Sequence, residues 1–231
     1  MNRPAIVFAI AIATLCFSVV QATDYYVDAV NGDDANDGLA AGEGHAMESF
    51  AALFAKYSIK SGDKVHAAAG VYAKGMMLSG STKFRLVVPA GVEVIGVGAD
   101  STTIEGQAHT NELGEVADLT ASPFGCGSNA LRGVYLGQGA ILRKFTVTRA
   151  YSNAYSDSGN GGGVLSASGK TGYLIDCVIT GCVGGRGAGS AYTTAVRCHF
   201  YSNRSQNTGS DIWLGSAFNC LFGDCPCGYL R

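Results

Sequence analysis

Charged residues, proline and tryptophan are scarce in this chain. Of its 231 residues, 15% are charged, four are proline and one is tryptophan. A formal net charge of −2 gives no basic face, so no nucleic-acid partner is expected. The apolar fraction of 47% is too high for a disordered chain. After residue 22 no apolar run is long enough to span a membrane, which predicts no transmembrane segment in the mature protein.

The N-terminus carries a long apolar run. Residues 5–20 contain no charge, and Val20 and Ala22 form the small-residue pattern that precedes a signal peptidase cut. This pattern predicts a signal peptide at residues 1–22, so the mature chain is expected to be secreted, periplasmic or on the cell surface. Removal of the peptide leaves seven of the eight cysteines. An odd number leaves at least one thiol without a partner inside the chain.

Glycine is abundant, with 33 residues, and it separates short apolar runs. This composition predicts an all-β protein with many turns. A helix is expected at residues 47–57, where Met47, Phe50, Phe54 and Tyr57 share one face. The short strands expected around this helix cover residues 25–28, 64–68, 85–88 and 92–95.

Residues 31–38 are rich in Asn, Asp and Gly. They resemble a calcium-binding loop, but Ala35 occupies a ligand position and Gly44 stands where the closing Glu belongs. We interpret the segment mainly as a series of turns stabilised by Asn and Asp side chains. Calcium is the one cofactor that stays open, and no metal ligand is assigned.

Four segments in the second half of the chain align without gaps. They start at Leu142, Leu174, Ala195 and Ala217, and their central residues are 32, 21 and 22 residues apart. A period in the low twenties, with short strands and glycine-rich corners, predicts a solenoid. Two or three strands fit into one coil, so the expected fold is all-β, a right-handed parallel β-helix with a short N-terminal capping helix.

Stacking then predicts columns of equivalent residues about 4.8 Å apart. One inward column consists of Phe145, Cys177, Cys198 and Cys220, and the next consists of Val147, Ile179, Phe200 and Phe222. Free cysteines pack well in such a core. If strict alternation continues, the column of Ile175, Val196 and Phe218 also faces inward, and Arg143 interrupts it.

Residues at the beginning of the mature chain resemble a known family. The motifs are Tyr25-Tyr26-Val27-Asp28, Asn31-Gly32-Asp33, Ser61-Gly62-Asp63-Lys64-Val65-His66 and Gly70-Val71-Tyr72. They are similar to the opening of pectate-lyase-like right-handed β-helix proteins, a group of polysaccharide lyases, other carbohydrate-active enzymes and exported proteins. The resemblance implies a helical cap on the N-terminal end and a polysaccharide or glycan partner.

The expected organisation is a single β-helix domain at residues 23–231. It divides into an N-terminal cap with the first coils (23–106), an insertion (107–132), stacked coils (133–224) and a tail (225–231). The tail is too short for another coil of about 21 residues. An open sheet edge invites pairing with another chain, so we expect self-association through the C-terminal edge or a longer natural protein, in preference to a tail that folds over the edge.

One outward column gathers the candidate catalytic residues Lys144, Asp176 and Arg197, followed by Asn219. A β-eliminating lyase uses a basic residue to remove the proton beside a uronate carboxylate, and acidic groups, often through calcium, neutralise that carboxylate. If the protein is an enzyme, it is therefore expected to be lyase-like. The favoured interpretation is a ladder of stacked unlike charges, because a lyase gathers several acidic residues and this column has one.

The insertion at residues 149–161 carries the candidate substrate-binding residues Tyr151, Asn153, Tyr155 and Asp157. Loops on a rigid scaffold are where function concentrates, and aromatic rings with amides and carboxylates suit sugars. Composition supports a solvated loop equally well. The sequence leaves two functions open: binding or processing of polysaccharide, and a non-catalytic surface or envelope module for adhesion or structure.

Two shorter runs bear on that choice. Gly162-Gly163-Val164 and Phe200-Tyr201-Ser202-Asn203 resemble repeats of bacterial polymorphic outer-membrane proteins, which are β-helical adhesins. Residues 209–215 resemble a pectin methylesterase signature, but the second catalytic Asp and the Arg motif of that family are not found. The esterase activity is therefore not carried over. The orientation of Trp213 stays undecided between the core and an exposed platform.

Overall fold

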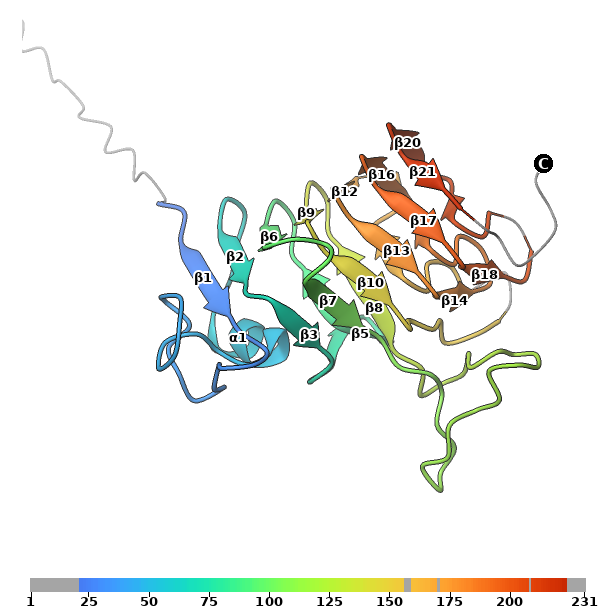
Figure 1. Ribbon diagram of the computed structural model, residues 1–231, viewed down its shortest axis with the longest axis horizontal. Helices are drawn as coiled ribbons and strands as arrows, with labels where there is room; N and C mark the ends of the chain where they lie inside the picture. The colour runs from blue at the N-terminus through green and yellow to red at the C-terminus, as the bar shows by residue number, and fades with distance from the viewer. Residues whose placement is uncertain (1–20, 156–158, 170, 208, 224–231) are drawn as a thin grey trace, which may run out of the picture.

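The computed structural model describes residues 21–155, 159–169, 171–207 and 209–223. Its strands stack in chain order along one long axis (Figure 1). Three parallel sheets run along this axis, and successive strands of the repeating part pass from one sheet to the next. The prediction of an all-β, right-handed parallel β-helix is confirmed. Most of the predicted signal peptide and the C-terminal tail lie outside the described residues.

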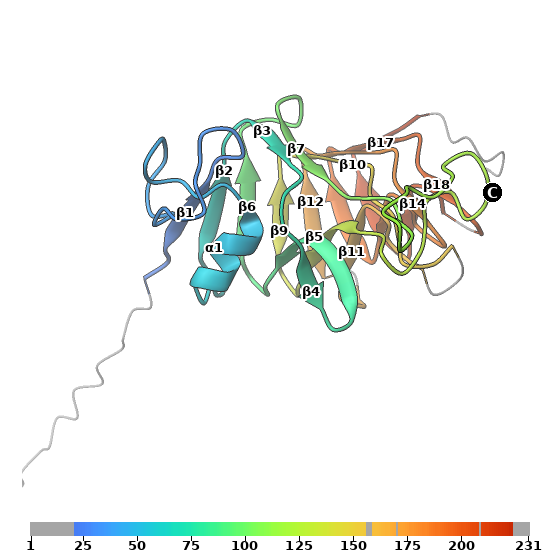
Figure 2. The ribbon, with the colours of Figure 1, turned by 90° about the horizontal axis from the view of Figure 1, so that it is seen from below.

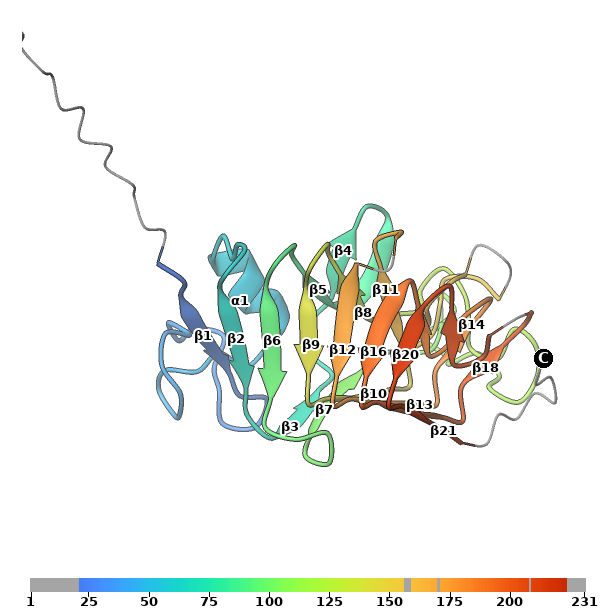
Figure 3. The same ribbon diagram turned by 90° about the horizontal axis from the view of Figure 1, so that it is seen from above.

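We name the seven-stranded sheet, which faces the viewer in Figure 3, sheet A. All of its pairings are parallel, and each strand pairs with the equivalent strand of the next coil. Its strands, in order, are β1 (Asp24–Val27), β2 (Lys64–Ala67), β6 (Glu93–Gly96), β9 (Ile141–Arg143), β12 (Gly172–Ile175), β16 (Thr193–Val196) and β20 (Ser216–Phe218).

Sheets B and C have six strands each. Sheet B consists of β3 (Gly70–Tyr72), β7 (Thr102–Glu105), β10 (Thr146–Thr148), β13 (Val178–Thr180), β17 (His199–Tyr201) and β21 (Leu221–Phe222). Sheet C consists of β4 (Met77–Ser79), β5 (Thr82–Val88), β8 (Arg132–Leu136), β11 (Val164–Ser166), β15 (Ser190–Ala191) and β19 (Ile212–Trp213), with β4 antiparallel to β5. A two-stranded sheet of β14 (Val183–Gly184) and β18 (Arg204–Ser205) lies between sheets B and C along the chain.

The helix lies at the N-terminal end of the stack (Figure 2). It covers Phe50–Lys56, shorter at both ends than predicted, because the Ser49 hydroxyl accepts the Ala52 N–H and begins the helix there. Met47, predicted inside the helix, instead bridges to Val27 in extended conformation. Phe50 and Leu53 are buried in the main core, so the helix covers that end of the stack as expected.

The four aligned repeats pair in the predicted register. Val147, Ile179, Phe200 and Phe222 are cross-strand neighbours in sheet B, and the first three are fully buried. The column of Phe145, Cys177 and Cys198 is equally buried, and Cys220 continues it. Each large apolar side chain in these columns contributes about 1.5–3 kcal/mol through burial.

The predicted inward column that contains Ile175 is wrong. Ile175 and Val196 are half-buried and Phe218 is exposed, while Leu174 in the adjacent column is fully buried. The reason lies at residue 176 and its equivalents, which have a positive φ of 52–62°. This left-handed residue turns the chain between sheets A and B, so strict alternation does not continue through the corner. Arg143 therefore faces outward and interrupts no core column.

The cysteines of the described residues are all free thiols: Cys126, Cys177, Cys182, Cys198 and Cys220. The first four are buried. The predicted packing role is therefore confirmed for Cys177 and Cys198, while Cys220 is partly exposed and Cys225 and Cys227 lie outside the described residues. Within those residues, no helix is long and apolar enough to cross a membrane.

Candidate functional site

Lys144, Asp176 and Arg197 stack at the corner between sheets A and B. Each is the left-handed residue of its coil, with φ of 62°, 55° and 52°. An L-residue in this conformation directs its side chain away from the core here, and the following residue returns to the interior. The structure thus brings the three candidate catalytic residues together on the outer surface, as the repeat predicted.

Their contacts are those of a charge ladder. Arg197 donates to both carboxylate oxygens of Asp176, from Nε at 2.7 Å and from Nη2 at 2.8 Å. Arg143 from the preceding coil lies 3.9 Å from the same carboxylate. These cations lower the pKa of Asp176, with the hydrogen bond from Arg197 as the main cause. Because its carboxylate already has two cationic partners, Asp176 is poorly placed to neutralise a substrate.

The opposite edge of sheet B has a different character, because both insertions leave from it. Residues 107–131 form an arm closed at its base by the bridge between Gln107 and Leu131, one residue short of the predicted end at Arg132. The arm, green in Figures 1 and 2, extends toward β14 and β18. Residues near its two ends pack against later coils, while residues 111–116 and 118–123 are exposed.

A second apolar cluster holds this arm in place. Ala108, Cys126 and Ala130 of the arm pack with Tyr151 and Val183 of the following coils. At the rim, the Phe124 ring meets Tyr155 edge-on at 5.2 Å and the Arg204 guanidinium at 4.2 Å. Residues far apart in the sequence thus form a compact flank beside the main core. We call residues 107–131 the arm from here on.

The predicted sugar-binding residues have separate surroundings. Tyr151 is 7% exposed inside the second cluster, so little of its ring is available for stacking on a sugar. Burial raises the pKa of the Tyr151 hydroxyl. Asn153 is exposed, and Tyr155 is half-buried against Phe124. Asp157 lies outside the described residues.

A pocket of about 300 Å³ opens between the arm and the corner that follows β7 and β10. We call it the arm pocket. Its polar wall includes Arg85, Glu105 and Arg149, and Tyr151 contributes its edge. The arm supplies both hydrogen-bonding and apolar groups, which are Gln107, Ala108, Thr110, Val116 and Leu119.

The charges of the arm pocket are held in defined positions. Arg149 contacts Glu105, with 2.9 Å between Nη1 and Oε1, while 71% of the Arg149 side chain remains exposed. Arg85 is 5% exposed, and its guanidinium donates to the carbonyl oxygens of Glu105 and Gly75. Burial lowers the pKa of Arg85, which nevertheless stays cationic at neutral pH because a guanidinium group is not deprotonated in proteins. Two cations therefore face one carboxylate.

The Arg149 backbone has φ of 48°, the left-handed region that side chains rarely adopt. Such a conformation costs about 1–2 kcal/mol relative to ordinary backbone. It turns the chain out of β10 and aims the long side chain along the pocket wall toward Glu105. The same conformation at Arg197 makes that residue a matched counterpart on the other edge of sheet B.

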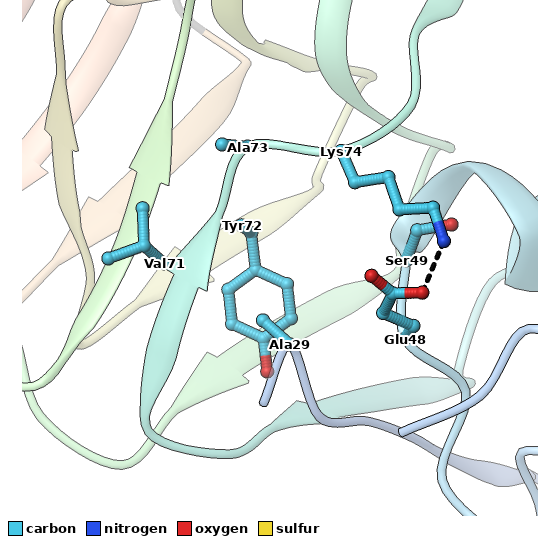
Figure 4. Close-up of a pocket in the computed structure, with 7 residues that line it drawn as sticks. All are labelled: Ala29, Glu48, Ser49, Val71, Tyr72, Ala73 and Lys74. Atoms are coloured by element: carbon cyan, nitrogen blue, oxygen red, sulfur yellow. Dashed lines mark hydrogen bonds and ion pairs between the residues drawn. The ribbon is translucent and has the colours of Figure 1, made fainter. Parts of the chain in front are cut away.

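A second pocket, of about 380 Å³, lies nearer the N-terminal end of the solenoid (Figure 4). Ala73 lines both pockets, so they are neighbours at the segment between β3 and β4. Lys74 reaches across this N-terminal pocket to Glu48, and Asp34 lies 3.5 Å from the Lys74 ammonium.

Sequence reasoning missed a buried polar pair near the C-terminal end. Asn203 is fully buried and donates to the Ile179 carbonyl and to the Asp211 carboxylate, each at 2.9 Å. Its own amide oxygen accepts the Cys182 N–H. Burial raises the pKa of Asp211. Asn203 lies one repeat of 21 residues after Cys182, and this equivalence was the available signal, since a polar residue in an apolar column needs a partner.

The Trp213 side chain is also placed. Trp213 pairs with Ala191, next to Ile212, which packs against the main core. Alternation therefore turns Trp213 to the outer face of sheet C. There its ring meets Tyr192 edge-on at 5.1 Å and the Arg186 guanidinium at 5.2 Å.

Residues 31–38 form turns of the predicted kind. Asp33 accepts the Ala35 N–H at 2.9 Å and Asp37 accepts the Leu39 N–H at 3.0 Å. Asp34 instead accepts from the backbone and hydroxyl of Ser49. Within the described ranges, no three His, Cys, Asp or Glu side chains are placed to hold one metal ion.

No family model and no curated protein matches the chain. Among solved structures, it is similar to pectin methylesterase PemA from Erwinia chrysanthemi, with 12% sequence identity and a TM-score of 0.42. The alignment covers 80% of this chain and spans 57% of that chain. A similarity of this degree does not bear on function.

Proposed function

We propose that this β-helix binds an elongated polysaccharide along the flank that carries the arm pocket and the N-terminal pocket. The observation that carries the proposal is that Ala73 lines both pockets, so that neighbouring units of one polymer could occupy them. Ligand sites combine apolar walls with a few convergent polar groups, and the arm pocket has both. Export of the chain, expected from its N-terminus, would bring it into contact with such polymers.

The arm pocket suits a sugar in its chemistry. Gln107 and Thr110 can hydrogen-bond hydroxyl groups, while Val116 and Leu119, which are 62% and 45% exposed, offer apolar contact to a ring face. With Arg85 and Arg149 against Glu105, the lining has one positive charge in excess. That excess favours a polysaccharide with carboxylate groups, because exposed guanidinium groups bind carboxylates in two-pronged geometry.

We infer binding without cleavage. The charge ladder lies on the A–B corner, and roughly 15 Å of chain separates Lys144 from Arg149 across sheet B at about 3.3 Å per residue. A sugar unit bound in the arm pocket would therefore not contact the charge ladder. The paired state of Asp176 supports the same inference. The separation of the two sites and the paired state of Asp176 both favour a non-catalytic surface module that adheres to acidic glycans.

Calorimetric titration with oligogalacturonate as the acidic probe and a cello-oligosaccharide as the neutral probe tests the proposal. We expect the acidic probe to bind about tenfold more tightly and to weaken as salt rises. Arg149→Ala is expected to lower that affinity by about tenfold, since one charged hydrogen bond contributes about 1.5 kcal/mol.

Arg197→Ala is the matched control. Like Arg149, Arg197 has a left-handed backbone and pairs with one acid, but it lies at the other corner of sheet B. The affinity of this variant for the acidic probe should equal that of the unaltered protein. Binding of neither probe would contradict the proposal. Release of unsaturated sugars, abolished by Lys144→Ala, would instead assign the function to the ladder and to an enzyme.

A further inference from the structure

Three cysteines of the inner column occupy equivalent positions in consecutive coils. Cys177 precedes Val178, Cys198 precedes His199 and Cys220 precedes Leu221, and these strand residues are direct cross-strand partners. The His199 N–H bonds the Cys177 carbonyl, and the Leu221 N–H bonds the Cys198 carbonyl, both at 2.9 Å. The three residues therefore follow one another at the coil spacing of about 4.8 Å.

Cys198 and Cys220 are in direct contact. The Cys198 N–H points at the Cys220 sulfur, 3.4 Å away. A disulfide requires Cα atoms about 4.4–6.8 Å apart, so the coil spacing already satisfies this requirement. Closing the bond needs a small approach of the two Cβ atoms, to about 3.8 Å.

The column has one accessible end. Cys177 and Cys198 are 1% and 2% exposed, whereas Cys220 is partly exposed in the last described coil. There β20 and β21 are edge strands, and their side chains Phe218, Leu221 and Phe222 are more than half exposed. An edge strand can shift more easily than an interior one, because it has a neighbour on one side only. A reagent can thus reach Cys220 first and leave Cys198 as the second thiol.

We propose that Cys220 and Cys198 form an oxidative modification site, at which a low-molecular-weight disulfide links the last two coils. The Cys220 thiolate attacks one sulfur of the reagent, forms a mixed disulfide and releases one reagent thiol. The Cys198 thiolate then attacks the Cys220 sulfur, forms the Cys198–Cys220 bond and releases the second reagent thiol. Two protein thiols are oxidised and one reagent disulfide is reduced to two thiols, which take up the two protons.

Cys198 lies between the two other cysteines of the column. Cys198 can bond Cys220 or Cys177 but not both, so one of the outer thiols stays reduced. Bonding to Cys220 ties the open edge to the interior coil, while Cys177 remains buried behind it. Thiolate is the reacting form. Burial raises the pKa of Cys220, so the reaction should accelerate as pH rises beyond the ordinary thiol value of 9.0.

The test uses the chain with Cys225→Ser and Cys227→Ser, because those two cysteines are close to Cys220 in sequence. The protein is incubated with oxidised glutathione, blocked with an alkylating agent, cut with trypsin and mapped by mass spectrometry. Cys198 lies in the peptide of residues 198–204, Cys220 in that of residues 205–231, and Cys177 in that of residues 171–186. Each pairing of peptides therefore has its own mass, and fragmentation of the 171–186 peptide distinguishes Cys177 from Cys182.

We expect the 198–204 and 205–231 peptides to be linked in most of the protein, and the melting temperature to rise on oxidation. Cys177→Ser should leave this link intact, while Cys198→Ser should leave glutathione attached to Cys220. Lasting glutathione on Cys220 in the protein that retains Cys198 would overturn the proposal. A dominant Cys177–Cys198 link, or no loss of thiols at all, would overturn it as well.

Discussion

The two edges of sheet B are built differently. At the A–B corner every coil from Lys144 onward turns at one left-handed residue, so the corner repeats without change in length. At the B–C edge, from β7 onward, the chain takes between 9 and 26 residues to pass from one sheet to the next, as the strand bounds show. The constant corner carries a surface charge ladder, and the variable edge carries a second apolar cluster and a pocket. The regular repeat therefore builds the scaffold, and the pocket forms where connections of unequal length interrupt the repeat.

The largest expected effect tests the turn of the constant corner. Leu174→Ala should lower the free energy of unfolding by about 2–5 kcal/mol, because Leu174 is fully buried in the core. Ile175→Ala should lower the free energy of unfolding by about 1 kcal/mol or less, because Ile175 is half-buried and faces outward. Urea denaturation of both variants checks this. Equal losses would mean that alternation continues through the corner after all.

A local effect is expected on the variable edge. Tyr151→Ala removes the ring that joins the arm to the later coils, so the arm should open while the coils stay folded. Cleavage by a glutamate-specific protease at Glu112 and Glu115 should accelerate by roughly tenfold, with the far-UV spectrum unchanged. Tyr173→Ala, on the outer face of sheet A, serves as the control. An unchanged cleavage rate would show that the second cluster does not hold the arm in place.

A smaller and stabilising effect is expected from Lys144→Gly. Glycine adopts φ of 62° without steric cost, so the variant should gain about 0.5–1 kcal/mol. The control is Thr146→Gly in the adjacent strand, which should lose stability. Thermal unfolding of the pair checks the sign. A lower stability of Lys144→Gly would show that the Lys144 side chain stabilises the corner by more than its left-handed backbone conformation costs.

The smallest effect concerns pH. Burial raises the folded-state pKa of Asp211 above 3.8, so the folded chain prefers the protonated acid. The stability that this preference contributes is complete below pH 3.8 and is lost as pH rises through the raised value. The unfolding free energy of the native protein relative to Asp211→Asn should therefore fall with pH across that window and then stay level. A relative stability that rises with pH would contradict the assignment.

The sequence predicted the scaffold well because stacking repeats one environment. Once Val147, Ile179 and Phe200 align, each must face the same interior. The turn at residue 176 was hidden because Lys, Asp and Arg hold the left-handed position, where glycine would have signalled it. The charge ladder could be predicted from register alone, as the Asp176 and Arg197 contact confirms.

The arm pocket could not be predicted in the same way. It depends on the packing of Ala108 and Cys126 against Tyr151 and Val183, contacts that join segments with no repeat between them. Composition marked the second insertion as a candidate through its tyrosines, yet Tyr151 anchors the arm and Arg149 supplies the exposed group. Periodicity predicts what repeats, and this site arises where the period is broken.

The central claim is that ligand lies on the variable edge and not on the charge ladder. Amide hydrogen exchange with and without saturating oligogalacturonate measures this directly. We expect slower exchange in residues 73–75, 105–119 and 149–151, and no change in residues 176–178 and 197–199. Slower exchange at the ladder with none in the arm would contradict the account.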